Sequence, residues 1–131
     1  MDTFTTTQIL AGLMGLYFVA AGINLLTNSE ATLGMIKDMI GQPVFGFLGG
    51  LVAFTVGGVI VAIHHDWSSL LAGFITLIGW IALAEGVLLI ACGKWFLGLF
   101  ARLKFTAGII KMFGAGTLTL GVVMIWAGLV A

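Results

Sequence analysis

Long apolar stretches separated by short polar ones make up nearly the whole chain. A helix needs about 20 apolar residues to cross a hydrocarbon core of about 30 Å, and four stretches of the sequence reach that length. Each of the four is therefore predicted to be a transmembrane helix. They run approximately through Gln8–Thr27, Pro43–Ile63, Leu70–Cys92 and Phe105–Val130.

Two connections between these stretches have a mixed pattern instead. Residues 29–41 place Leu33, Ile36 and Ile40 at helical spacing, with charged residues on the opposite side. Residues 94–104 combine apolar and aromatic residues with basic ones in the same way. Amphipathic helices of this kind lie flat in the membrane interface. We therefore predict one interfacial helix between the first two spans and another between the last two.

Composition agrees with a membrane location. Of 131 residues, 61% are hydrophobic and 8% are charged, whereas roughly a quarter of a soluble domain is charged. The sequence thus predicts a single all-α membrane domain over residues 1–131. Its expected architecture is a four-helix bundle built from two tandem units, each with a span, an interfacial helix and a second span. The formal net charge is zero and no basic run is present, which argues against a nucleic-acid partner.

Basic residues predict the orientation in the membrane. Lysine and arginine near the ends of spans remain in the cytoplasm. The two ends of the chain and the turn at residues 64–69 hold none. Both termini are therefore expected on the periplasmic or extracellular side of an inner (plasma) membrane. The two longer connections, expected on the cytoplasmic side, hold Lys37, Lys94, Arg102 and Lys104.

An internal repeat is predicted when the sequence is compared with itself at an offset of 64 residues. About a dozen identities result without a gap, and many of them are glycines. Glycines spaced seven apart on each span would let helix backbones approach closely in a left-handed bundle. The glycines to which we assign this packing role are Gly15, Gly22, Gly50, Gly57, Gly79, Gly86, Gly114 and Gly121.

Two charges lie inside the predicted spans. Glu85 comes about fifteen residues into the third span, roughly 22 Å from its outer end, and Lys111 lies roughly 9 Å inside the fourth span from the cytoplasmic side. These depths agree within one helical turn, so an intramembrane Glu85–Lys111 ion pair is the simplest explanation. The alternatives are a proton or ion relay at Glu85, or a Lys111 that reaches the headgroups while Glu85 is protonated or faces a second subunit.

The turn between the second and third spans holds a second group of polar side chains. His64, His65 and Asp66 could contact a metal or haem on the outer face, or respond to pH. Two adjacent histidines rarely ligate one ion from a rigid element, and a polar turn in which Asp66 and the residues after it cap the third span is the simpler interpretation. We predict no metal site and no cofactor.

The chain resembles a loosely defined group of small, uncharacterised bacterial inner-membrane proteins with four spans. In that group a histidine-containing turn that ends in tryptophan precedes a span of the form L-I-G-W followed by a glycine. The matching residues here are His64, Trp67, Leu77, Ile78, Gly79, Trp80 and Gly86. The resemblance implies the four-span architecture and no particular activity.

Catalysis is not expected, because no pair of titratable groups converges on a substrate site and no serine or cysteine has an evident base. We predict a non-catalytic membrane protein that acts by association, either as a homo-oligomer or as a small accessory subunit of a larger membrane complex. The alternative is a small ion- or proton-coupled transporter or channel that uses Glu85. A third option is the outward-facing metal or haem contact at His64 and His65.

Overall fold

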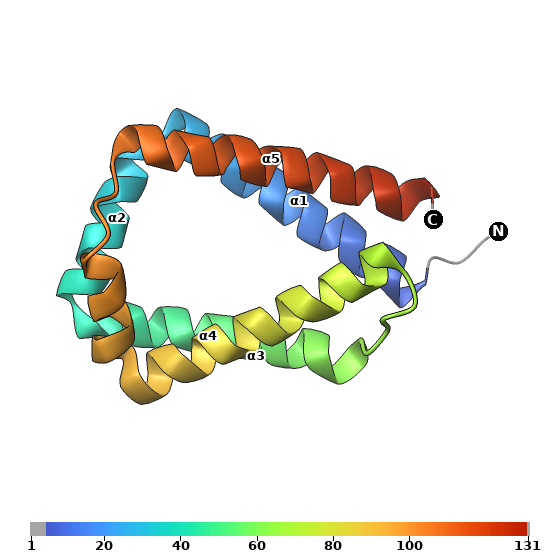
Figure 1. Cartoon of the computed structure of the whole chain (residues 1–131), viewed down its shortest axis with the longest axis horizontal. Helices are drawn as coiled ribbons and strands as arrows, with labels where there is room; N and C mark the ends of the chain where they lie inside the picture. Colours follow the sequence, from blue (N-terminus) through green and yellow to red (C-terminus); the bar gives the residue numbers. More distant parts are fainter. Residues whose placement is uncertain (1–4, 131) are drawn as a thin grey trace. The chain divides into compact units, whose positions relative to one another are not determined.

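The computed structural model describes residues 5–130, and that part of the chain consists of five α-helices and no strand. Four of the helices are long and apolar enough to cross a membrane. The predicted all-α class of membrane helices is therefore confirmed. The helices are α1 (Thr6–Thr27), α2 (Ser29–Gly41), α3 (Pro43–Ile63), α4 (Leu70–Ala101) and α5 (Ala107–Val130), as Figure 1 shows.

Local capping explains why α1 begins two residues before the predicted Gln8. The Thr5 hydroxyl oxygen accepts a hydrogen bond from the Gln8 backbone N–H at 3.2 Å. In return the Gln8 side-chain oxygen accepts one from the Thr5 backbone N–H at 2.9 Å. Such a capping box satisfies two backbone donors at a helix start. The pattern Thr-x-x-Gln is visible in the sequence, so this boundary could have been predicted.

The third span and the interfacial segment after it form one continuous helix, α4, with a break inside it. Cys92 has φ −142° and ψ 46°, which is not a helical conformation. The helix then ends at Ala101, three residues before the predicted end of the interfacial helix. Residues 104–106 are not helical, and the Thr106 hydroxyl accepts a hydrogen bond from the Ile109 backbone N–H at 3.2 Å. This cap makes α5 begin at Ala107.

The helices are grouped into two compact units. The first, called here the α1/α5 unit, contains α1, α5 and the first residues of α4. The second, called the α3/α4 unit, contains α3, the second part of α2 and the remainder of α4. Each unit therefore has two antiparallel helices at its centre, and each is described by itself below.

In the α1/α5 unit, glycines bring two helix backbones into direct contact. A Cβ atom added at Gly22 would lie 2.6 Å from the Leu118 backbone nitrogen and 2.8 Å from the Gly114 carbonyl oxygen. One added at Gly121 would lie 2.6 Å from the Gly15 carbonyl oxygen. No real side chain tolerates such distances, so only glycine permits this approach. The two helices lie side by side in Figure 1.

The α3/α4 unit has the same kind of contact. A Cβ atom at Gly57 would lie 2.8 Å from the Gly79 carbonyl oxygen, and one at Gly86 would lie 2.8 Å from the Gly50 carbonyl oxygen. A Cβ at Gly86 would also collide with the Phe54 backbone nitrogen. The eight glycines to which the sequence analysis assigned a packing role therefore all lie in contacts between two helices of the same unit.

Positions 64 residues apart have matching surroundings in the two units. The Gly15–Gly121 contact corresponds to Gly79–Gly57, and the Gly22–Gly114 contact corresponds to Gly86–Gly50. The breaks after the first and third spans also correspond: Asn28 has φ −127° and ψ 42°, close to the angles of Cys92. Each unit takes one long helix from each half of the chain, so the packed pair differs from the span–interfacial helix–span segment that is contiguous in sequence.

Replacing a contact glycine is expected to destabilise the protein, whereas replacing a neighbouring open glycine is not. In Gly121→Ala the new methyl group meets backbone atoms of α1 that cannot move independently. Overpacking of this kind costs about 1–3 kcal/mol, so the thermal unfolding midpoint in mild detergent should fall. Gly116→Ala lies on the same helix with no atom within 4 Å of the added carbon, and it should leave the midpoint unchanged or slightly higher. Equal losses in both variants would contradict the contact.

Candidate functional site

Glu85 lies on the flank of α4 in the α3/α4 unit. It directly precedes Gly86, which contacts α3, and one residue corresponds to a rotation of about 100° around a helix. Its side chain is exposed and makes no hydrogen bond or ion pair with the described residues of its own unit. A carboxylate in this apolar helix is costly to leave in hydrocarbon. The α3–α4 contact therefore leaves Glu85 available to another helix.

Lys111 lies in the other unit, on α5, directly after the buried Ile110. The Lys111 side chain is also exposed and has no hydrogen-bond partner among the described residues of the α1/α5 unit. Sequence reasoning placed the third and fourth spans next to each other, but their contacts with glycine are made to other helices: α4 contacts α3, and α5 contacts α1. An ion pair between Glu85 and Lys111 would join the two units, and it stays a prediction.

The two adjacent histidines have different environments. His64 follows the last residue of α3 and is buried, with 3% of its surface exposed. Its Nδ1 atom lies 2.7 Å from the hydroxyl oxygen of Thr76, which is fully buried on α4. His65 is exposed. Hydrogen bonding satisfies a buried imidazole that would otherwise be costly, so His64 connects the end of α3 to α4.

The residues after the histidines form a local turn and a helix cap. An Asp66 carboxylate oxygen accepts a hydrogen bond from the Ser68 backbone N–H at 2.8 Å, which is a typical turn for this residue type. The Ser69 hydroxyl accepts one from the Ala72 backbone N–H at 3.1 Å and so caps α4. Within residues 5–130 no group of three or more His, Cys, Asp or Glu side chains is placed to hold a metal ion.

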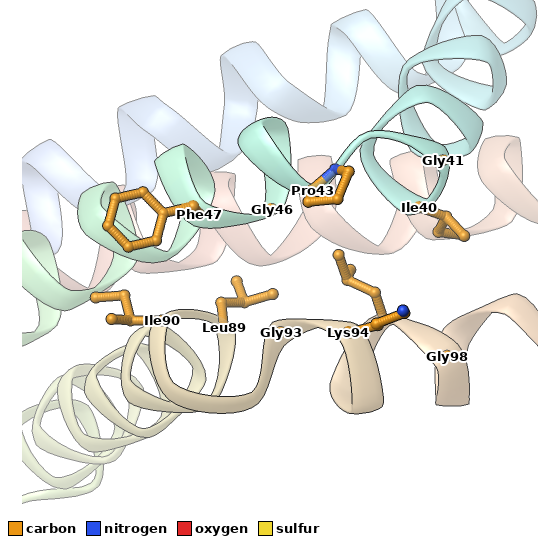
Figure 2. A pocket seen from close by; sticks show the side chains of 11 residues that line it. Ile40, Gly41, Pro43, Gly46, Phe47, Leu89, Ile90, Gly93, Lys94 and Gly98 are labelled. Atoms are coloured by element: carbon orange, nitrogen blue, oxygen red, sulfur yellow. The ribbon is translucent and has the colours of Figure 1, made fainter.

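A cavity of about 410 Å³ lies in the α3/α4 unit, and sequence reasoning did not identify it. One wall comes from the end of α2 and the start of α3, and the other comes from the part of α4 around the break at Cys92 (Figure 2). Lys94 is the only charged residue in the lining. The other lining residues are apolar or glycine: Ile40, Gly41, Pro43, Gly46, Phe47, Leu89, Ile90, Gly93, Leu97 and Gly98.

Glycine creates much of this space. At Gly41, Gly93 and Gly98 no atom lies within 4 Å of the place where a Cβ would be. These three glycines do not fit the seven-residue spacing between Gly50 and Gly57, and they were not assigned a packing role. Their position on both sides of Lys94 and at the end of α2 is the sequence signal that could have indicated a cavity.

A smaller, more open groove of about 270 Å³ lies in the α1/α5 unit. It is lined by apolar residues and glycines of α1 and α5, together with Gln8. The Gln8 side-chain nitrogen donates a hydrogen bond to the Gly128 carbonyl oxygen at 3.1 Å. This bond joins the two helices near the start of α1. The groove has no charged lining residue and no feature that selects a ligand.

Comparison with known proteins gives no match to a protein family, a curated protein or a solved structure. The resemblance to small four-span bacterial membrane proteins therefore stays a prediction. The chemistry of the described residues is the remaining basis for a functional proposal.

Removal of the Thr76 hydroxyl is expected to destabilise the protein. Thr76→Val keeps the shape of the side chain but takes the hydrogen-bond partner away from the buried His64 Nδ1 atom. Leaving a buried polar atom without that partner costs about 1–3 kcal/mol, which should lower the unfolding midpoint in detergent. Thr119→Val is the control, because the exposed Thr119 hydroxyl bonds only the Ala115 carbonyl of its own helix. A midpoint that is unchanged in Thr76→Val would rule out a structural role for the bond.

Proposed function

We propose that this multi-pass membrane protein is non-catalytic and acts by association inside the bilayer, as a homo-oligomer or as a small accessory subunit of a larger membrane complex. The observation that carries the proposal is the exposed carboxylate of Glu85 on an apolar helix. Polar side chains within membranes almost always face a protein partner or a water-filled cavity. A helix that supplies this partner is the simplest means of accommodating Glu85.

The distribution of mass supports a contact at the level of the lipid. Between residues 5 and 130, only short connections lie outside the five helices. Large side chains on the spans are exposed, among them Tyr17 at 69%, Trp80 at 48% and Trp126 at 64%. A protein with so little extramembrane surface would meet its partners through the exposed faces of its spans and through α2.

The contact glycines do not support oligomerisation by themselves. All eight lie against a helix of their own unit, so a second subunit would have to use other surfaces. Lateral association would therefore depend on polar contacts such as the one expected at Glu85, and on packing of the exposed apolar side chains.

The internal repeat is also part of the proposal. Its support is the match between contacts 64 residues apart in the two units, together with the matching breaks at Asn28 and Cys92. Each half of the chain crosses the membrane twice, so a pseudo-two-fold axis would run along the membrane normal. We keep the proposed location in an inner (plasma) membrane with both termini outside, because of the basic residues in the two longer connections.

Native mass spectrometry of particles extracted in lipid nanodiscs tests the proposal directly. The expected mass corresponds to more than one copy, or to this chain with a defined partner. One interhelical polar contact in a bilayer contributes about 0.6–2 kcal/mol. Glu85→Gln should therefore weaken association roughly 3- to 30-fold. Glu30→Gln, which changes an exposed carboxylate of α2, should not. Recovery of the unmodified protein only as a monomer would contradict association.

Transport is the second candidate, because a carboxylate inside a span is the usual coupling group of proton- and ion-driven carriers. In liposomes, Glu85→Gln would abolish proton or cation flux if this candidate holds, while Glu30→Gln would preserve it. We expect no flux that depends on Glu85. A flux that is lost in Glu85→Gln and retained in Glu30→Gln would replace association with transport as the proposed function.

A further inference from the structure

We propose that the cavity around Lys94 binds an anionic phospholipid, with the lipid phosphate at the Lys94 ammonium group and one acyl chain along α3 and α4. The proposal rests on the lining of the cavity and on the order of its polar and apolar parts along α4. It does not depend on association or transport.

The charge of the lining selects the sign of the ligand. Lys94 is exposed and is the only charged residue among the eleven that surround the cavity. The nearest acidic residue in sequence to the α2 wall, Asp38, is not in the lining. Pro43 places the start of the 21-residue helix α3 at the same cavity, and the partial positive charge of a helix start adds to that of Lys94. An anion therefore finds attraction and no opposing carboxylate.

The apolar part of the lining begins one helical turn away. Ile90 lies four residues before Lys94, about 6 Å along a helix, and the break at Cys92 separates the two. Leu89 and Leu97 are buried, whereas Phe47 and Ile90 are exposed at the sides of the cavity. Figure 2 shows Phe47 on the α3 side across from Ile90 on the α4 side. A ligand with an anionic end and a hydrocarbon body matches this sequence of surfaces.

A membrane lipid is the ligand of this chemistry that is present wherever the protein is folded. The end of α2 and the part of α4 after Cys92 are the amphipathic segments of the chain, so the cavity lies where spans pass into interfacial helices. Basic pockets between membrane helices at this depth bind anionic lipid headgroups. The volume of about 410 Å³ holds a headgroup and the first part of an acyl chain.

The corresponding positions in the other half of the chain would not form the same site. Sixty-four residues from Lys94 lies Glu30, and the same offset relates Gly46 to Ile110 and Gly93 to Ser29. An acidic residue stands in place of the cation, and larger buried side chains stand in place of the glycines. This difference means that the site is particular to the α3/α4 unit, and it supplies matched control positions.

The experiment measures lipid retention by native mass spectrometry of the full chain, released from nanodiscs that contain phosphatidylglycerol and phosphatidylcholine in equal amounts. We expect one phosphatidylglycerol to be retained in preference to phosphatidylcholine. Lys94→Gln should reduce that preference about fivefold, the size expected for one basic residue at an anionic lipid surface. Lys104→Gln removes an exposed lysine that does not line the cavity, and it should leave the preference unchanged.

A second pair of variants tests the cavity independently of its charge. Gly98→Leu fills the lined space and should abolish retention of the lipid. Gly34→Leu, 64 residues earlier and likewise with no atom within 4 Å of an added Cβ, should retain it. Unfolding midpoints of both variants show whether each has folded. If Gly98→Leu does not fold, Gly98→Ala with its smaller methyl group takes its place, with a several-fold reduction expected.

Three results would overturn the proposal. Equal retention of the two lipids would remove the role of the anionic headgroup. Equal effects of Lys94→Gln and Lys104→Gln would indicate general surface charge in place of a site. Displacement of the lipid by excess inorganic phosphate alone would show that the cavity binds free phosphate, because the acyl chain would then contribute nothing to binding.

Discussion

Close contact between helix backbones is the interaction on which this fold depends. In a bilayer, apolar side chains gain little by facing one another, since lipid tails are equally apolar. Helices are then held together by dispersion forces between backbones that approach closely, and this approach requires positions without a Cβ atom. Gly15, Gly22, Gly114 and Gly121 meet the requirement in one unit, and their counterparts 64 residues away meet it in the other. The large side chains are consequently left for the outer faces of each pair.

This arrangement also determines where charged groups can lie. A contact made of glycine has no room for a carboxylate or an ammonium group, so Glu85 and Lys111 lie beside the contacts in their respective units. The same physical requirement that brings the backbones together thus displaces the polar groups to the sides, where a further helix can reach them. An association surface with a carboxylate in it is the natural result of helix pairs built this way.

Glycine has a second, different use in the α3/α4 unit. At Gly46 the missing side chain is replaced by Leu97, whose Cδ1 atom would lie 2.6 Å from an added Cβ. At Gly93 and Gly98 nothing replaces it, and a cavity results beside Lys94. The break at Cys92 changes the direction of α4 between the buried Leu89 and the exposed Lys94. One helix therefore supplies both the hydrocarbon wall and the cation of the proposed lipid site.

The sequence by itself determined the helices, because a membrane requires each span to satisfy its own backbone hydrogen bonds over a length set by the bilayer. It also indicated which glycines pack, since their seven-residue spacing places them on one face. It could not determine which spans pair, because all four present the same glycine spacing; only the tertiary structure joined α1 to α5 and α3 to α4. Nor could adjacency in the chain separate His64 from His65, as burial against Thr76 depends on a helix twelve residues away. The cavity at Lys94 arises where three segments meet, and no periodicity within one segment encodes such a space.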